Sequence, residues 1–327
     1  MSKSDIRQRV GDMSQIAGAR LVTYEEGHAR GMRVVEVDNG TGLRFTVLVD
    51  RGMDLGTASW RGTAFSYISK TGLCAPRNLP GWEIKRGWEG GLLYTCGLTN
   101  IGPAITDDGD LLAMHGSYNN NAASDLCVRN DWDGDVYRMS VSGRVTESRL
   151  FGECLTVERT ISTAYGSNVI ELHDEVVNDG YDRTPFMILY HMNYGWPLLD
   201  ADSVFTTNTG NKRPRDAAAV PGLDENERFS DPIPGYAEQV FYFDSPENAW
   251  AMIRNERLGF GVRIRYDGRQ LPHLMEWKMM GQEEYVLGIE PGTQFPEGRI
   301  VARERGLLEY LEPGEKRCFD LRIQIEE

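Results

Sequence analysis

The chain has 327 residues, of which 49 are acidic and 35 are basic, so its formal net charge is -14. A charge of this sign repels the phosphate backbone of nucleic acids and the surface of anionic membranes, so we expect neither as a partner. The sequence has no run of roughly 18 apolar residues that could span a membrane, and its first residues lack the apolar core of a signal peptide. We therefore expect a cytoplasmic protein.

The first predicted element is a short helix near the N-terminus. Apolar residues recur there at spacings of three or four, with charged residues between them: Ile6, Val10, Met13 and Ile16. This period is typical of one face of an amphipathic helix. We expect the helix to pack on the rest of the chain through this face.

Beyond this helix the sequence consists of short segments rich in Val, Ile, Tyr, Phe and Thr, separated by turn signals such as DNGTG, DDGD and DWDGD. In the last segment Leu321, Ile323 and Ile325 alternate with polar residues, as in a strand with one buried and one wet face. Many short strands without intervening helices predict an all-β fold, a large antiparallel β-sandwich that forms one domain over residues 1–327. The clearest segments are LRFTVLVD, VYRMSVSGRV, CLTVERTIST, VIELHDEVVN, QVFYFD, GVRIRY and FDLRIQIEE.

One stretch between these strands differs from the rest. Residues 208–239 are rich in charge, proline and glycine and show no strand or helix period. A long excursion of this kind in a compact domain is either disordered or a functional flap. Because strand-like segments flank it on both sides, we interpret it as a loop insertion rather than a linker.

The cysteines give no sign of a metal site or a disulfide framework. They are odd in number and widely scattered, with no C-x-x-C pair. We expect them to be reduced and mostly buried as small hydrophobic residues. They are Cys74, Cys96, Cys127, Cys154 and Cys318.

Four ionisable residues stand at the ends of apolar strands or within them. His115 lies in LLAMHGSYNN, His191 in ILYHMNYG, Glu290 at the end of YVLGIE, and Arg51 directly after FTVLVD. Taken one at a time, each has a purely structural interpretation, because buried polar groups are nearly always satisfied by hydrogen bonds. Their shared placement favours a common site.

The segments around these residues resemble a known family. LGIEPGTQFPEG resembles the segment of aldose 1-epimerases (galactose mutarotases) that carries their catalytic base. MHGSYNN resembles their first His-Gly motif, LYHMNYG their second histidine, and DRGMDLG their early Arg-Gly turn. The motifs occur in the family's order and span most of the chain. The resemblance implies a β-supersandwich fold and a divergent branch of the galactose mutarotase-like superfamily.

The resemblance also implies an activity and its catalytic residues. A mutarotase opens a sugar ring by removing the proton of the anomeric hydroxyl while protonating the ring oxygen, then closes the ring from the other face. On this basis Glu290 is the expected base, His191 the acid, and His115 a hydrogen-bond donor to the ring or anomeric oxygen. Acid–base groups placed in this way contribute about 10²- to 10⁴-fold each. The chemistry needs no cofactor and no metal.

Substrate-binding residues follow from the same motifs. Arg51 would orient hydroxyls through its fixed fork of donors. Asn193 and Gln294 stand in the second histidine motif and in the glutamate motif, where two extra residues precede Gln294. The family's sugar-binding Asp has no unambiguous counterpart, although Asp216 and Asp231 lie in a suitable region.

Aromatic residues supply an expected sugar platform. Trp82 and Trp88 lie in a glycine-rich segment, and an aromatic ring suits the C–H face of a sugar. An equally plausible alternative is that these side chains pack the edge of the sandwich. In PHLMEWKMMG, Glu276 and Lys278 share one face of a strand. We expect this face to line the cleft, where Lys278 would bind an acidic group of the substrate; otherwise it is a solvated charge.

Three other functions fit the same residues. Two histidines and a carboxylate on strands could form a metal centre of cupin-like chemistry, although no His-x-His pair is present. Glu276 and Glu290 could be the two carboxylates of a glycosidase. The protein could also bind carbohydrate without catalysis. The expected partner is a small carbohydrate, neutral, acidic or phosphorylated, and the protein could form a homodimer.

Overall fold

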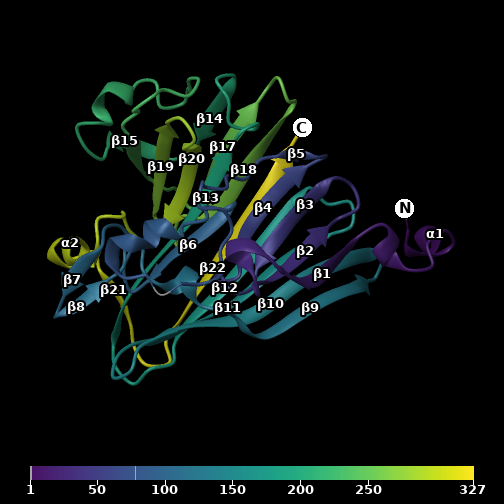
Figure 1. Cartoon of the computed structure of the whole chain (residues 1–327), viewed down its shortest axis with the longest axis horizontal. Helices are drawn as coiled ribbons and strands as arrows, with labels where there is room; N and C mark the ends of the chain where they lie inside the picture. The colour runs from purple at the N-terminus through teal and green to yellow at the C-terminus, as the bar shows by residue number, and fades with distance from the viewer. Residues whose placement is uncertain (1, 78) are drawn as a thin grey trace.

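Antiparallel strands are the main secondary structure of the molecule (Figure 1). The structure is a computed structural model that describes residues 2–77 and 79–327. The two α-helices in this part of the chain are short, α1 (Lys3–Arg7) and α2 (Arg299–Glu304), and neither is long and apolar enough to cross a membrane. The predicted all-β fold is confirmed.

Three large sheets and one small hairpin contain the strands. The five-stranded sheet is formed by β1 (Gly18–Thr23), β2 (Arg33–Asp38), β3 (Leu43–Leu48), β4 (Asp54–Trp60) and β5 (Thr63–Ala64). The eight-stranded sheet has the order β14 (Ser203–Thr207), β17 (Asn248–Asn255), β18 (Phe260–Asp267), β22 (Lys316–Glu326), β12 (Val169–Asn178), β11 (Cys154–Ala164), β10 (Val136–Ser148) and β9 (Ser124–Asp133). The third large sheet has the order β15 (Gly210–Pro214), β16 (Gln239–Asp244), β19 (His273–Met280), β20 (Tyr285–Gly292), β13 (Thr184–Gly195) and β21 (Glu309–Leu311), with β6 (Leu93–Leu98) paired to β13.

The remaining elements are short. The hairpin is formed by β7 (Ile105–Asp107) and β8 (Asp110–Leu112). The 3-10 helices are η1 (Met13–Gln15), η2 (Gly27–Ala29), η3 (Gly81–Arg86), η4 (Tyr118–Asn120) and η5 (Val220–Gly222).

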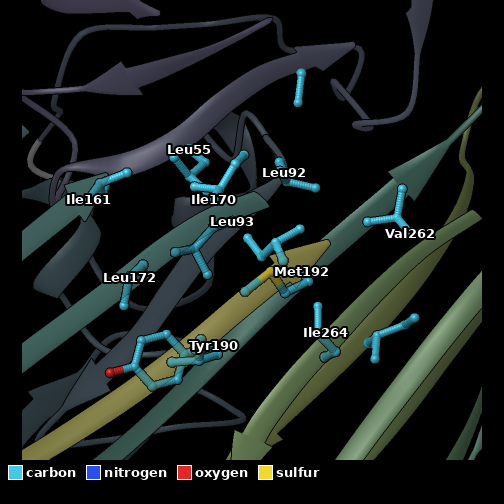
Figure 2. Packing of buried hydrophobic residues seen from close by; sticks show 14 of the residues in the cluster. Leu55, Leu92, Leu93, Ile161, Ile170, Leu172, Tyr190, Met192, Val262 and Ile264 are labelled. Atoms are coloured by element: carbon cyan, nitrogen blue, oxygen red, sulfur yellow. The ribbon is translucent and has the colours of Figure 1, made fainter. Parts of the chain in front are cut away.

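One hydrophobic core joins the three large sheets. Figure 2 shows Leu55 of β4, Ile161 of β11 and Tyr190 of β13 converging on it, each from a different sheet. Strand β13 is buried on both faces, because alternate residues point to opposite sides. Tyr190 and Met192 face this core, whereas His191 faces the other side of the sheet. The apolar run around His191 therefore describes a strand whose second face lines a cavity.

The N-terminal helix is shorter than predicted. Helix α1 ends at Arg7, and η1 forms a separate turn further along the chain. Gly11 disfavours helix between them, and the Asp12 side chain accepts a hydrogen bond from the backbone N–H of Ser14, which starts a new turn. Of the four predicted apolar contacts, only Ile6 is fully buried.

The cysteine prediction is correct in one respect and wrong in another. All five are free thiols, but only Cys74 and Cys96 are buried. Cys127 and Cys318 are exposed because they lie on the outward-facing positions of β9 and β22, and Cys154 is half-buried.

The segment 208–239 is ordered rather than a free loop. Its first residues form β15, which pairs with β16 at the edge of the third sheet, and η5 follows. Further on, Ile233 forms a backbone bridge to Gly281, and Asn226 is buried. The segment therefore packs against the third sheet.

Candidate active site

His191 and Glu290 lie next to each other on neighbouring strands. In the β13–β20 pairing Leu189 is opposite Gly292 and Met192 is opposite Ile289. The same register sets His191 directly across from Glu290, on the face turned away from the main core. The Nε2 of His191 is 3.1 Å from Oε1 of Glu290, and both side chains are almost completely buried. The structure thus brings the expected acid and base into direct contact.

Gly288 leaves the space that this pair occupies. A Cβ at position 288 would lie 2.4 Å from Oε1 of Glu290 and 3.1 Å from Cε1 of His191. A contact of 2.4 Å is well inside van der Waals distance, so any side chain here would displace the carboxylate. The glycine in VLGIE therefore serves the site rather than a turn.

His115 enters the same site from a strained turn. Its φ is 59° and that of Gly116 is 77°, and a Cβ at Gly116 would lie 2.1 Å from the carbonyl oxygen of Gly97. The His115 ring centroid is 5.9 Å from that of His191. The backbone N–H of Gly102 donates to Nδ1 of His115 at 3.4 Å, so the neutral ring carries its proton on Nε2.

These three residues line a cavity of about 580 Å³ with an aromatic wall. The Trp88 ring centroid is 5.8 Å from those of both His191 and Trp277. Trp82 lies at the rim, half-exposed, with the Nζ of Lys85 5.1 Å from its ring. Both predicted tryptophans therefore line the cavity, and Tyr67 and Tyr94 extend the same wall.

Burial shifts the pKa values of Glu290, His191 and His115. It raises the pKa of Glu290 well above the usual value; the carboxylate of Glu238 adds to this, and Arg215 opposes it. Burial, together with the neighbouring His115, lowers the pKa of His191 to about 3. Burial likewise lowers the pKa of His115 to about 4. Burial therefore favours the neutral form of both partners, a protonated carboxyl and an unprotonated imidazole.

Sequence reasoning missed an ion pair at the cavity between two residues of the segment 208–239. Nη2 of Arg215 donates to Oε1 of Glu238 at 2.9 Å, and Nε1 of Trp277 donates to Oε2 of the same carboxylate at 2.8 Å. All three residues line the cavity. Asp216 instead accepts from Nε of Arg215, and neither it nor Asp231 is among the lining residues. The only available signal was the charge of this segment, because it has no period.

Arg51 does not line the cavity, so its predicted contact with the substrate is wrong. Its side chain is 3% exposed. Nε donates to Oε1 of Glu89 at 3.0 Å, Nη2 to Oε2 of Glu89 and to the carbonyl oxygen of Gly87, and Nη1 to Oδ1 of Asn120. The N–H groups of Arg51 that would bind a sugar therefore donate to Glu89, 38 positions further along the chain.

The prediction that Glu276 and Lys278 line the cleft is also wrong. On β19 it is Trp277 and Met279 that face the cavity, so the alternate residues face the other side. Glu276 accepts a hydrogen bond from Nδ2 of Asn226 at 2.8 Å, and Nζ of Lys278 donates to backbone carbonyls of the segment 208–239. The two charges fix this segment, and Glu276 cannot pair with Glu290 across a substrate.

Asn193 and Gln294 support the site without entering it. Nδ2 of Asn193 donates to the carbonyl oxygens of Gly91 and His191, at 3.1 and 3.0 Å. Nε2 of Gln294 donates to the carbonyl oxygen of Leu307 at 2.5 Å. Neither lies among the residues that line the cavity, where a sugar was predicted to meet them.

The site does not present a ready-made metal centre. Across residues 2–77 and 79–327, no group of three or more His, Cys, Asp or Glu side chains is placed to hold a metal ion. In the ligand-free site the Nε2 of His191 faces Glu290 rather than an open coordination position.

Comparison with protein families places most of the chain in one family. The model of the family described as "Domain of unknown function (DUF4432)" matches residues 29–325. A search of curated proteins gave no match.

Solved structures share the whole fold. A protein from Klebsiella pneumoniae subsp. pneumoniae, described as a candidate aldose 1-epimerase, is 26% identical with a TM-score of 0.88 over 99% of this chain and 86% of its own. The galactose 1-epimerase from Lactobacillus acidophilus is 16% identical with a TM-score of 0.61 over 95% of this chain and 99% of its own. A galactose mutarotase-like protein from Clostridium acetobutylicum is 14% identical with a TM-score of 0.63 over 96% of this chain and 99% of its own. The last two show the fold alone. The protein therefore has the galactose mutarotase-like sandwich that its motifs predicted.

Proposed function

The chain belongs to the DUF4432 family, and we propose that this member is an aldose 1-epimerase-like enzyme that interconverts sugar anomers by general acid–base catalysis. The observation that carries the proposal is the contact of 3.1 Å between Nε2 of His191 and Oε1 of Glu290 inside an aromatic cavity. The pair offers a proton donor and a proton acceptor at one place, which ring opening requires.

The single proton of the pair is sufficient for the whole reaction. Burial favours the proton on Glu290, and its transfer to His191 gives a carboxylate beside an imidazolium. The carboxylate then takes the proton of the anomeric hydroxyl while His191 protonates the ring oxygen, and the bond between C1 and the ring oxygen breaks. This step returns the pair to its first form. Rotation of the open-chain aldehyde about C1–C2, followed by the reverse transfers, gives the other anomer.

The surrounding groups fit the substrate of this reaction. Nε2–H of His115 is available to the oxygen atoms at the reacting centre, because Nδ1 is occupied by the N–H of Gly102. The rings of Trp88 and Trp277 offer apolar faces to a pyranose or furanose ring. The Arg215–Glu238 pair provides a charged donor and a charged acceptor for hydroxyl groups.

The alternatives rest on less of the geometry. A two-carboxylate glycosidase needs a second carboxylate opposite Glu290, and Glu276 faces the other side of the sheet. A carbohydrate-binding protein without catalysis would leave the buried His191–Glu290 contact without a role. A metal-dependent isomerase needs His, Cys, Asp or Glu side chains grouped to hold the ion, and no group of three or more in the described residues is placed in this way.

Anomer exchange measured by NMR tests the proposal. The protein is mixed with neutral, acidic and phosphorylated sugars at chemical equilibrium, with and without a chelator, and exchange between the α and β signals is followed. We expect accelerated exchange for at least one class of sugar, unchanged by the chelator. Exchange that stops on chelation would support a metal-dependent reaction instead, and binding without exchange would support a carbohydrate-binding protein.

A further inference from the structure

The DRGMDLG turn lies outside the cavity, yet Arg51 reaches both neighbours of Trp88. Its guanidinium donates to the carbonyl oxygen of Gly87 at 2.9 Å and forms a two-point ion pair with Glu89. Arg51 is 3% exposed and Glu89 is 1% exposed. A buried pair of this kind resists displacement because each charge left alone would be desolvated and uncompensated.

Other hydrogen bonds hold the same short segment. The hydroxyls of Ser69 and Thr71 donate to the carbonyl oxygen of Trp88, at 2.5 and 2.9 Å. The backbone N–H of Ser69 donates to the carbonyl oxygen of Glu89 at 2.9 Å. The Trp88 backbone is therefore fixed from two sides, by Arg51 and by the strand-like segment at Ser69.

Trp88 occupies the centre of the aromatic wall. Its ring centroid lies 5.8 Å from those of His191 and Trp277, 6.0 Å from that of Tyr94 and 6.2 Å from that of Tyr67. A shift of this indole would change the shape of the cavity and the packing against the edge of the His191 ring.

From these contacts we infer that Arg51 and Glu89 are a positioning pair that sets the place of Trp88 and thereby the affinity of the cavity for a sugar. Neither residue lines the cavity. For its activity readout the inference rests on the proposed function, but the placement of Trp88 can be measured without any substrate. The arginine of the DRGMDLG turn thus acts through a tryptophan rather than on hydroxyl groups.

The variants separate positioning from stability. Removing one partner, as in Glu89→Gln, leaves a buried charge and endangers folding, whereas replacing both with apolar residues of similar length often preserves stability. The double variant Arg51→Met/Glu89→Met therefore removes the contact with Gly87 while keeping the site filled. Arg33→Gln is the matched control, because Arg33 binds Asp50 of the same turn with two side-chain contacts and lies away from the cavity.

The first readout is fluorine NMR of protein labelled with 5-fluorotryptophan. The chain has seven tryptophans, and Trp88→Phe assigns the Trp88 signal by its loss. We expect the Trp88 signal to shift or broaden in the double variant, with Arg33→Gln resembling the parent protein. The signal of Trp250, which lies on β17 of the eight-stranded sheet and is assigned by Trp250→Phe, should stay unchanged. An unchanged Trp88 signal in a folded double variant would overturn the inference.

The second readout is the kinetics of anomer exchange. The double variant should raise KM about tenfold, the size expected for a misplaced aromatic contact, with kcat within about twofold of the parent. An equal rise in KM in Arg33→Gln would contradict the positioning role. So would a fall in kcat at constant KM in the double variant. If no sugar reacts with the parent protein, the proposed function fails, while the Trp88 signal still decides the inference.

Discussion

Glu276 and Glu290 lie on adjacent strands, one residue out of register, and face opposite sides of the same sheet. Glu290 is opposite Met275, and Glu276 is opposite Ile289. Both are buried, and burial raises the pKa of both, that of Glu276 to about 8. Glu290 meets His191 in the cavity, whereas Glu276 meets Asn226 behind the sheet. Two similar carboxyl groups therefore lie in different environments, because side chains one position apart in register point to opposite faces of the sheet.

The proposed reaction predicts a bell-shaped dependence of kcat/KM on pH. Activity needs one proton on the His191–Glu290 pair. It should fall on the acid side as the histidines become protonated, with pKa values of about 3 for His191 and about 4 for His115. It should fall on the alkaline side as Glu290, whose pKa is raised, loses its proton. The test is an anomer-exchange profile on folded protein, and a rise in activity through the alkaline range would contradict it.

Glu238→Gln should move this profile in a known direction. The Glu238 carboxylate raises the pKa of Glu290 and that of His115, so its removal lowers both. The alkaline limb should therefore move to lower pH, and KM should rise about tenfold through the lost pairing with Arg215. The profile of the variant is compared with that of the parent at the same ionic strength. An alkaline limb that moves upward would contradict the electrostatic account.

The free energy of unfolding should depend on pH through the buried carboxyl group of Glu290. Because the pKa of Glu290 is raised above its ordinary value of 4.5, its contribution to stability is fully present below about pH 4.5 and is lost as pH rises toward the folded-state pKa. Glu290→Gln has no such proton to lose. The free energy of unfolding of the variant minus that of the parent should therefore increase in urea titrations as the pH rises above about 4.5. A constant difference would mean that Glu290 is not desolvated.

Gly288→Ala should damage the reaction by crowding. The added methyl group would lie 2.4 Å from Oε1 of Glu290, so the carboxylate must move. A displacement of about 1 Å can cost about 10²-fold in rate, and overpacking costs about 1–3 kcal/mol in stability. Gly210→Ala is the control, because a Cβ there meets nothing within 4 Å. A fully active Gly288→Ala protein would show that the His191–Glu290 contact is not required.

Local sequence patterns predicted the strands and the three catalytic candidates. The alternation of Leu321, Ile323 and Ile325 with polar residues matches a strand that is buried on one face only. Gly288, which leaves space for the Glu290 carboxyl group, lies only two positions before it in the same motif.

The wrong assignments depended on long-range structure. The alternation of residues in PHLMEWKMMG predicted that Glu276 and Lys278 share one face of a strand. It did not predict which face of that strand meets the cavity. Arg51 is satisfied by Glu89, a partner far along the chain that no spacing rule identifies. Arg215 and Glu238 come from an irregular segment, where no periodicity marks the residues that reach the cavity.

The central claim is tested most directly by comparing Glu290→Gln with Glu276→Gln in the NMR anomer-exchange assay, using a sugar that the parent protein accepts. Both changes replace a buried carboxyl of raised pKa with a neutral amide of the same shape. We predict that Glu290→Gln loses at least about 10²-fold in kcat while Glu276→Gln stays within about threefold of the parent. Exchange at the parent rate in a folded Glu290→Gln protein would contradict the assignment of Glu290 as the catalytic base.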